Sequence, residues 1–136
     1  MTLYSCGSPR GVSNPEARLQ YHFKQWEGTP YRLGGNTQRG VDCSSFVRII
    51  MKETYGVQLP RTTREQLSFG TEVHPSSIRM GDLVFFRTGR TSYHVGIMMR
   101  GDFFMHASTT RGVTIDRLRE PYWQERILQF RRVTRR

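Results

Sequence analysis

The sequence predicts an α+β fold in which helices come first and an antiparallel sheet follows. Over the first half of the chain, apolar residues recur at intervals of three and four, as they do in amphipathic helices. Over the second half they gather in short runs separated by Gly, Asp and Ser, as they do in strands. This order is typical of an α+β domain, and 136 residues suffice for one hydrophobic core.

The domain proper is expected over residues 14–136. Residues 1–13 are rich in Gly, Pro and Ser and have no apolar period, which indicates a flexible leader or tether. A helix should begin at Asn14-Pro15, with Asn as N-cap and Pro in the first turn. Leu19, Phe23 and Trp26 would form its apolar face, and Glu27-Gly28 would end it.

A glycine-rich loop and a second helix follow. Residues 29–41 contain Pro30 and three glycines, too many breakers for a regular element. From Cys43 the pattern is helical until Tyr55-Gly56, so this helix is predicted to start at the cysteine. A short third helix is expected over residues 63–69.

Five apolar runs are predicted as strands: 83–86, 94–99, 103–106, 112–115 and 128–133. If the second and third form a hairpin that turns at residues 100–102, His94 and His106 lie near the same end of neighbouring strands.

The composition limits the classes of partner. The chain carries 21 Lys and Arg against 11 Asp and Glu, a net charge of +10, and only Lys24 and Lys52 are lysines. Nucleic acid, an anionic lipid surface or the acidic polymers of a bacterial wall would all suit this charge. No apolar run is long enough to cross a membrane, and the first residues lack the apolar region of a signal peptide.

The two cysteines, Cys6 and Cys43, have no metal-binding spacing, so neither a metal nor an organic cofactor is expected. The segment from Leu3 to Gly7 is similar to the end of a lipoprotein signal, in which a cysteine is lipidated. Two alternatives follow for Cys6: a lipidated residue in a longer precursor, or an exposed thiol in the leader.

Cys43 is a candidate nucleophile because the unpaired N–H groups and the dipole of a helix N-terminus favour a thiolate. The alternative is a core cysteine. His94 would serve as general base and then general acid, and His106 would orient it. For these two, the alternative is a pair of hydrogen-bonded core histidines.

The same region resembles the NlpC family of cell-wall cysteine endopeptidases. The similarity covers residues 26–123, and its motifs keep their order and spacing: Tyr31 to Gly35, Gly40 to Phe46, Leu59 to Thr62, Gly81 to Phe86, His94 to Ile97 and His106 to Ser108. One departure is Ser45, which stands where the family usually has glycine and would either tighten the helix start or narrow the cleft.

The resemblance implies a papain-like α+β fold with the nucleophile at a helix N-terminus. It implies that Cys43 is the nucleophile, His94 the base and His106 the orienting residue. Tyr31 would help to stabilise the oxyanion. Asp42, Ser44 and Arg61 are weaker candidates for binding an amine or carboxylate of the substrate.

The function implied is that of a thiol protease that hydrolyses peptidoglycan stem peptides, commonly between D-glutamate and a diamino acid. The protein would act in the bacterial cell envelope, in the periplasm or anchored to a membrane through a lipidated Cys6. The oligomeric state is open, and a monomer is favoured.

Three other classes share some of these features. They are a non-catalytic module that binds wall peptides, a Cys-His amidase or acyltransferase, and a nucleic-acid-binding domain. No RNA-binding aromatic strand or zinc-finger pattern accompanies the positive charge. We therefore expect no nucleic-acid partner.

Overall fold

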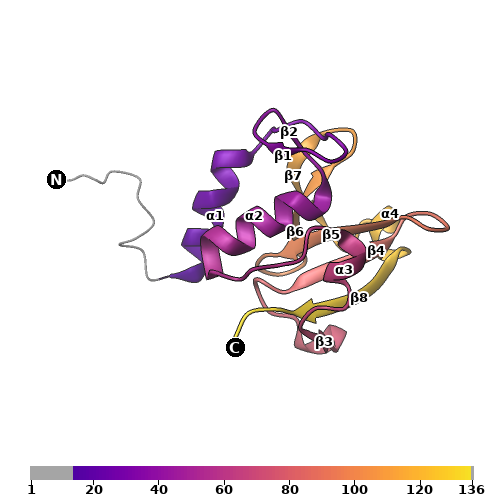
Figure 1. Ribbon diagram of the computed structural model, residues 1–136. Helices are drawn as coiled ribbons and strands as arrows, with labels where there is room; N and C mark the ends of the chain where they lie inside the picture. Colours follow the sequence, from indigo (N-terminus) through magenta and orange to yellow (C-terminus); the bar gives the residue numbers. More distant parts are fainter. Residues whose placement is uncertain (1–13, 136) are drawn as a thin grey trace.

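Two helices cover one face of a six-stranded antiparallel sheet in the computed structural model, which describes residues 14–135 (Figure 1). The helices come from the first part of the chain and the main strands from the second, as predicted. The expected leader, with Cys6, lies outside the described residues.

The first two helices begin and end where the sequence predicts. Helix α1 spans Pro15–Trp26, and the Asn14 side chain accepts a hydrogen bond from the backbone N–H of Glu16. Helix α2 spans Cys43–Tyr55. It ends at Gly56, whose φ of 70° is a left-handed conformation that glycine adopts without strain. The predicted helix start at the cysteine is confirmed.

The main sheet has the strand order β3-β8-β4-β5-β6-β7, and every neighbouring pair is antiparallel. All five predicted strands form, with ends shifted by one or two residues at most: β4 (Leu83–Arg87), β5 (Tyr93–Met98), β6 (Phe103–Ser108), β7 (Gly112–Arg117) and β8 (Ile127–Arg132). The turn between β5 and β6 forms the predicted hairpin.

The sequence missed the shortest elements, because two to four residues show no period. They are β1 (Asn36–Thr37) and β2 (Gly40–Val41) in the glycine-rich loop, β3 (Thr71–Val73), the 3-10 helix η2 (Pro75–Ser77) and α4 (Pro121–Gln124). Helix α3 (Thr63–Gln66) is shorter than the predicted 63–69, since the chain continues from it in tighter turns.

The sheet separates two hydrophobic clusters. In β4, Leu83 and Phe85 pack with α1 and α2, whereas Val84 and Phe86 belong to the cluster on the opposite face. His94 pairs with Phe86 across β4 and β5, so it shares the second face. One face of the sheet therefore packs against α1 and α2. His94 and His106 belong to the opposite face.

Gly96 allows β5 and β6 to approach closely beside the histidines. A Cβ at this position would lie 2.9 Å from the carbonyl oxygen of Met105 and 3.3 Å from the Cβ of His106. Cβ atoms essentially never come within 3.0 Å of a backbone oxygen, so a larger residue would force the strands apart.

We predict that Gly96→Ala destabilises the fold by about 1–3 kcal/mol, the usual cost of overpacking. It should also change the ring NMR signals of both histidines, because His106 must move. Gly56→Ala is the control: it introduces a left-handed alanine at a cost of about 1 kcal/mol, far from β5. Unchanged histidine signals in folded Gly96→Ala would contradict the role of Gly96.

Candidate active site

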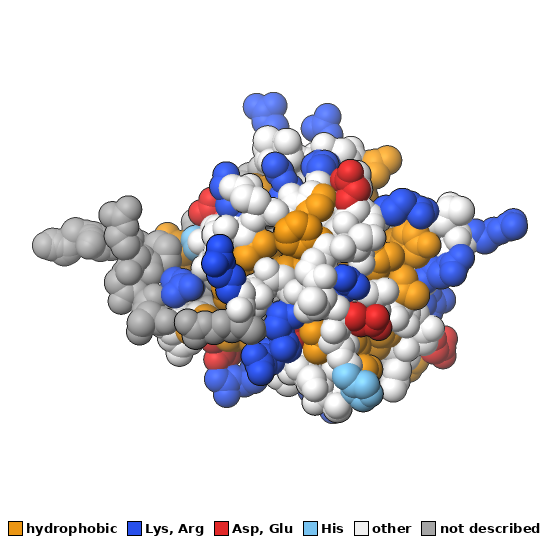
Figure 2. Space-filling model, turned by 60° about the horizontal axis from the view of Figure 1, so that its bottom comes forward, with side chains coloured by type: hydrophobic (Ala, Val, Ile, Leu, Met, Phe, Trp, Pro, Cys, Tyr) orange, Lys and Arg blue, Asp and Glu red, His pale blue; other side chains and the backbone are white. Residues whose placement is uncertain are grey.

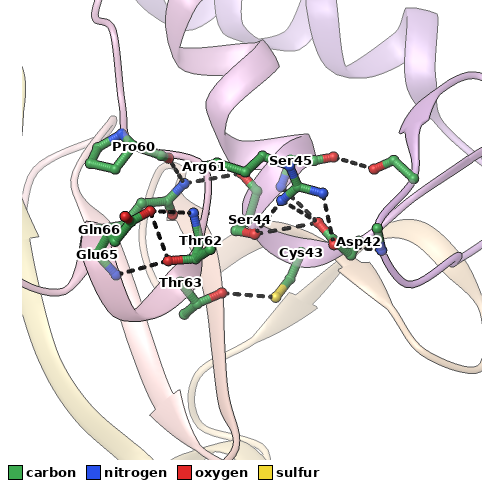
Figure 3. Close-up of polar contacts among 12 residues, drawn as sticks. Asp42, Cys43, Ser44, Ser45, Pro60, Arg61, Thr62, Thr63, Glu65 and Gln66 are labelled. Carbon is green, nitrogen blue, oxygen red and sulfur yellow. Dashed lines mark hydrogen bonds and ion pairs between the residues drawn. The ribbon is translucent and has the colours of Figure 1, made fainter.

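Cys43 lies at the first turn of α2, against the start of β5. Its side chain is buried, and Sγ lies 3.4 Å from Oγ1 of Thr63 at the start of α3 (Figure 3). The backbone N–H of Val95, the residue after His94, also hydrogen-bonds to the sulfur. The structure thus brings the predicted nucleophile to the strand that carries the predicted base.

The surroundings of Cys43 act on its ionisation in two opposite directions. Burial raises the pKa of this thiol, and hydrogen bonds from Thr63 and Val95 offset only part of that effect. The helix N-terminus is present, but the apolar surroundings of Sγ outweigh it. Burial therefore opposes the thiolate that the helix N-terminus was expected to favour.

His94 is the first member of a buried hydrogen-bonded chain of three side chains. Its Nε2 lies 2.8 Å from Nδ1 of His106, and Nε2 of His106 lies 2.7 Å from Oδ2 of Asp116. His106 pairs with Thr114 across β6 and β7, so Asp116 is its diagonal neighbour on the same face. The two predicted histidines meet, and Asp116 joins them.

The carboxylate of Asp116 fixes the direction of the protons in this chain. A carboxylate only accepts, so His106 must donate from Nε2, and its Nδ1 is then an acceptor when the ring is neutral. His94 must therefore donate from Nε2. The unprotonated nitrogen of His94 is then Nδ1, the ring nitrogen nearest the backbone of β5.

The electrostatics of the chain favour neutral histidines beside a charged carboxylate. Burial and, to a smaller extent, the neighbouring His106 lower the pKa of His94 to about 3, although Asp116 acts in the opposite direction. Burial also lowers the pKa of His106. Burial alone would raise the pKa of Asp116, but hydrogen bonds from His106 and Arg111 bring it below its usual value.

Trp123, on α4, covers the histidine pair. Its ring stacks on His94 at a centroid distance of 5.4 Å and meets His106 edge-on at 5.1 Å. Phe86 also packs against His94, and Phe104 against His106. These apolar groups keep water from the His94–His106 hydrogen bond, which strengthens it.

Asp42, Ser44 and Arg61 form one polar cluster beside the nucleophile (Figure 3). Asp42 is the N-cap of α2 and accepts from the backbone of Ser45 and of Gly34, each at 2.9 Å. Arg61 contacts both carboxylate oxygens and the Ser44 hydroxyl. Burial alone would raise the pKa of Asp42, but these partners lower it. The cluster fixes the helix start, with Arg61 partly exposed.

Tyr31 and Ser45 occupy the loop side of the nucleophile. Burial raises the pKa of Tyr31, and the nearby Cys43 and Asp42 raise it further, so its hydroxyl keeps its proton. The Ser45 hydroxyl donates to the carbonyl oxygen of Gly35 and ties the glycine-rich loop to α2. Of the two effects predicted for Ser45, tightening of the helix start is the one that its contacts support.

Sequence reasoning missed three residues of this site: Thr63, Asp116 and Trp123. Asp is uncommon inside strands, so the position of Asp116 within β7 was a signal that could have marked it as a site residue. Thr63 and Trp123 gave none, because threonine at a helix start and tryptophan in a short helix have ordinary structural roles.

Comparison with known proteins identifies the family to which this chain belongs. The model of the NlpC/P60 family matches residues 28–132. The chain belongs to the NlpC/P60 family. The match covers every residue of the candidate site described above.

Individual relatives show how far the similarity extends. The murein DD-endopeptidase/LD-carboxypeptidase MepS of Escherichia coli is 47% identical over 118 residues, which are 87% of this chain and 63% of MepS. A gamma-DL-glutamyl hydrolase of Bacillus subtilis is 37% identical over 80% of this chain and 27% of its own length. The chain thus spans less than two thirds of either relative.

A solved structure supports the papain-like α+β fold of the family. The crystal structure of a lipoprotein-like NlpC/P60 protein of Staphylococcus aureus aligns with a TM-score of 0.80 at 29% identity. The alignment covers 91% of this chain and 43% of that one.

We predict that Thr63→Val raises the pKa of the Cys43 thiol further, because a hydrogen bond that lowers it is lost. At a given pH near 8, less thiolate is then present. The rate of Cys43 alkylation by iodoacetamide should fall roughly fivefold, for a hydrogen bond of about 1 kcal/mol. Thr71→Val, at an exposed position, is the control. Faster alkylation would show instead that the thiol donates to Thr63.

Proposed function

We propose that this protein is a peptidoglycan endopeptidase that hydrolyses the amide bond between D-glutamate and a diamino acid in stem peptides. The observation that carries the proposal is the placement of Cys43 at the β5 strand that bears His94, with His94, His106 and Asp116 in one hydrogen-bonded chain. The name of MepS supports a peptidoglycan substrate, and the name of the gamma-DL-glutamyl hydrolase supports a glutamyl bond.

The first half of the reaction forms an acyl-enzyme. Nδ1 of His94 takes the proton of the Cys43 thiol as Sγ attacks the amide carbonyl carbon. The carbonyl oxygen becomes an oxyanion. When the C–N bond breaks, His94 gives the proton to the leaving amine, and a thioester links the D-glutamyl carbonyl to Sγ.

The second half releases the product. His94 takes a proton from water, and the resulting hydroxide attacks the thioester carbonyl. The C–S bond breaks, the product leaves as a carboxylic acid, and the proton returns to Sγ. Positive charge on His94 is transient in both halves. It is stabilised through His106 by the carboxylate of Asp116, which thereby acts as a positioning residue.

Oxyanion stabilisation is assigned to Tyr31 and to N–H groups at the start of α2. The Tyr31 hydroxyl remains protonated and lies near Cys43, so it is available as a donor. Asp42, Ser44 and Arg61 would contribute to substrate binding through Arg61, the partly exposed member of their cluster. Asp42 itself is already engaged by Arg61 and two backbone N–H groups.

The bacterial cell envelope is the proposed location, and stem peptides are the proposed partner. No helix within residues 14–135 is long and apolar enough to cross a membrane. Lipidation of Cys6 would anchor the protein, and the lipoprotein-like name of the Staphylococcus aureus neighbour is in line with this. On the face shown in Figure 2, basic side chains are spread over much of the surface. Together with the net charge of +10, this suits attraction to anionic polymers.

Cys43→Ala should abolish hydrolysis of purified muropeptides while the circular dichroism spectrum stays unchanged, because the substitution removes the nucleophile and little volume. Mass spectrometry of the digests identifies the products and separates hydrolysis from acyl transfer. Turnover near the wild-type rate would contradict the assignment. Binding without turnover by the wild type would favour a non-catalytic module.

The histidine chain should show graded losses. We expect His94→Ala to lose nearly as much activity as Cys43→Ala, and His106→Ala to retain more. Asp116→Asn should lose roughly tenfold in kcat, less than the roughly 10²–10⁴-fold contribution of a group that transfers the proton itself. Asp116→Asn should also change the protonation pattern of the His94 and His106 ring nitrogens in ¹⁵N NMR spectra.

Asp102→Asn is the matched control for Asp116→Asn. It removes another Asp–Arg pair, with Arg117, without touching the histidines. Equal kcat in the two variants, with unchanged ring nitrogens in Asp116→Asn, would rule out the role given to Asp116.

A further inference from the structure

An arginine-lined pocket of about 580 Å³ lies where the first turn of α1, the end of α2 and the end of β8 meet. These segments lie together at the lower left of the ribbon in Figure 1, at the opposite end of α2 from Cys43. None of the described residues that line it is acidic, and four are arginines: Arg18, Arg79, Arg132 and Arg135. We call it the Arg135 pocket. Its volume is within the roughly 300–1,000 Å³ of small-molecule sites.

Two of these arginines present N–H groups that no other described residue uses. Arg135 is exposed, and its side chain makes no hydrogen bond or ion pair within residues 14–135. Arg132 contacts the buried carboxylate of Asp82 through Nε and Nη2, at 2.9 and 2.8 Å, and Nη2 also donates to the carbonyl oxygen of Ser77. These bonds fix the guanidinium, while its Nη1 has no partner in the same range. The pocket therefore offers donors to an anion.

The choice of arginine narrows the class of anion. A guanidinium group is planar and always charged, and its parallel N–H groups fit the two oxygens of a carboxylate or a phosphate. Neither of the two lysines of the chain, Lys24 and Lys52, lines the pocket. None of the four pocket arginines has a part in the proposed hydrolysis. The pocket is thus a candidate site for a ligand other than the scissile peptide.

The position of the pocket favours a phosphate at a membrane surface. The leader joins the domain at Asn14, and the next residue, Pro15, lines the pocket. Cys6 precedes Asn14 by eight positions, and eight residues of fully extended chain span at most about 30 Å. Lipidation of Cys6 would therefore hold the pocket close to the membrane, where phospholipid phosphates are the nearest anions.

We propose that the Arg135 pocket binds the phosphate group of an anionic phospholipid at the membrane surface. Arg132 and Arg135 would donate to the phosphate oxygens, while Arg18 and Arg79 add positive charge around them. The site is separate from the hydrolytic one. The choice of a lipid over a soluble phosphate rests on the proposed lipidation of Cys6.

Helix α2 separates this pocket from the nucleophile. Cys43 is its first residue, and Tyr55, its last, lines the pocket. At 1.5 Å per residue the two ends lie about 18 Å apart. A lipid in the pocket would leave the active site uncovered and turn it away from the membrane. An anchored enzyme would thereby face the peptidoglycan rather than the lipid.

Vesicle sedimentation tests the proposal with the full chain carrying Cys6→Ser, so that no lipid anchor contributes. At about 0.15 M salt this protein should bind vesicles of phosphatidylcholine and phosphatidylglycerol but not vesicles of phosphatidylcholine alone. The double variant Arg79→Gln/Arg135→Gln should bind roughly thirtyfold more weakly, as expected when two arginines leave an anionic surface. No binding to the mixed vesicles would overturn the proposal.

Arg39→Gln/Arg90→Gln is the matched control. Both residues are exposed and lie outside the pocket, and either double variant lowers the net charge from +10 to +8. The control should keep most of the vesicle binding, because charges more than a Debye length of about 8 Å from the membrane are screened. Equal losses in the two variants would mean that net charge alone attracts the protein, and would overturn the pocket assignment.

Polyphosphate separates a lipid from a soluble phosphate polymer. Vesicle binding that persists in excess polyphosphate would support the lipid. Polyphosphate binding that needs Arg79 and Arg135, without vesicle binding, would overturn the membrane assignment. Both double variants should hydrolyse muropeptides in solution at the wild-type rate, and Cys43→Ala should bind vesicles as the parent protein does. Failure of either proposal therefore leaves the other standing.

Discussion

The hydrogen-bonded chain from Asp116 through His106 to His94 is the constraint on which the rest of the site depends. A buried carboxylate accepts and never donates, so it decides which nitrogen of each ring carries a proton. The unprotonated Nδ1 of His94 follows from that choice. Three features hold these side chains at hydrogen-bonding distance. They are the pairing of β6 with β7, the lack of a side chain at Gly96, and the packing of the Trp123 ring on His94.

Burial gives this site its resting state. The same apolar surroundings raise the pKa of Cys43 and lower that of His94, so burial disfavours the charged form of both side chains. In the proposed mechanism, charges separate only when a substrate carbonyl is present to take up the negative charge. The helix start contributes by position, because Asp42 and Arg61 fix the first turn that carries the sulfur.

Local patterns in the sequence predicted most of the fold. An Asn-Pro start and a glycine stop are signals within one or two turns of a helix, and the short apolar runs of β4 to β8 involve only neighbouring residues. The short elements could not be predicted in this way. Strand β3 exists because its three residues pair with β8, more than fifty positions away, and its own sequence does not encode that pairing.

The sequence by itself determined that a cysteine begins a helix and that two histidines lie on adjacent strands. It also carried the ordered motifs of the NlpC/P60 family. Only the tertiary structure decided what surrounds them. The contact of Thr63 with the sulfur, the diagonal approach of Asp116 to His106 and the stacking of Trp123 on His94 depend on strand register and on helix placement. Strand register and helix placement are set by packing of the whole core. The pKa shifts that burial causes could therefore not be deduced from residue types and spacing.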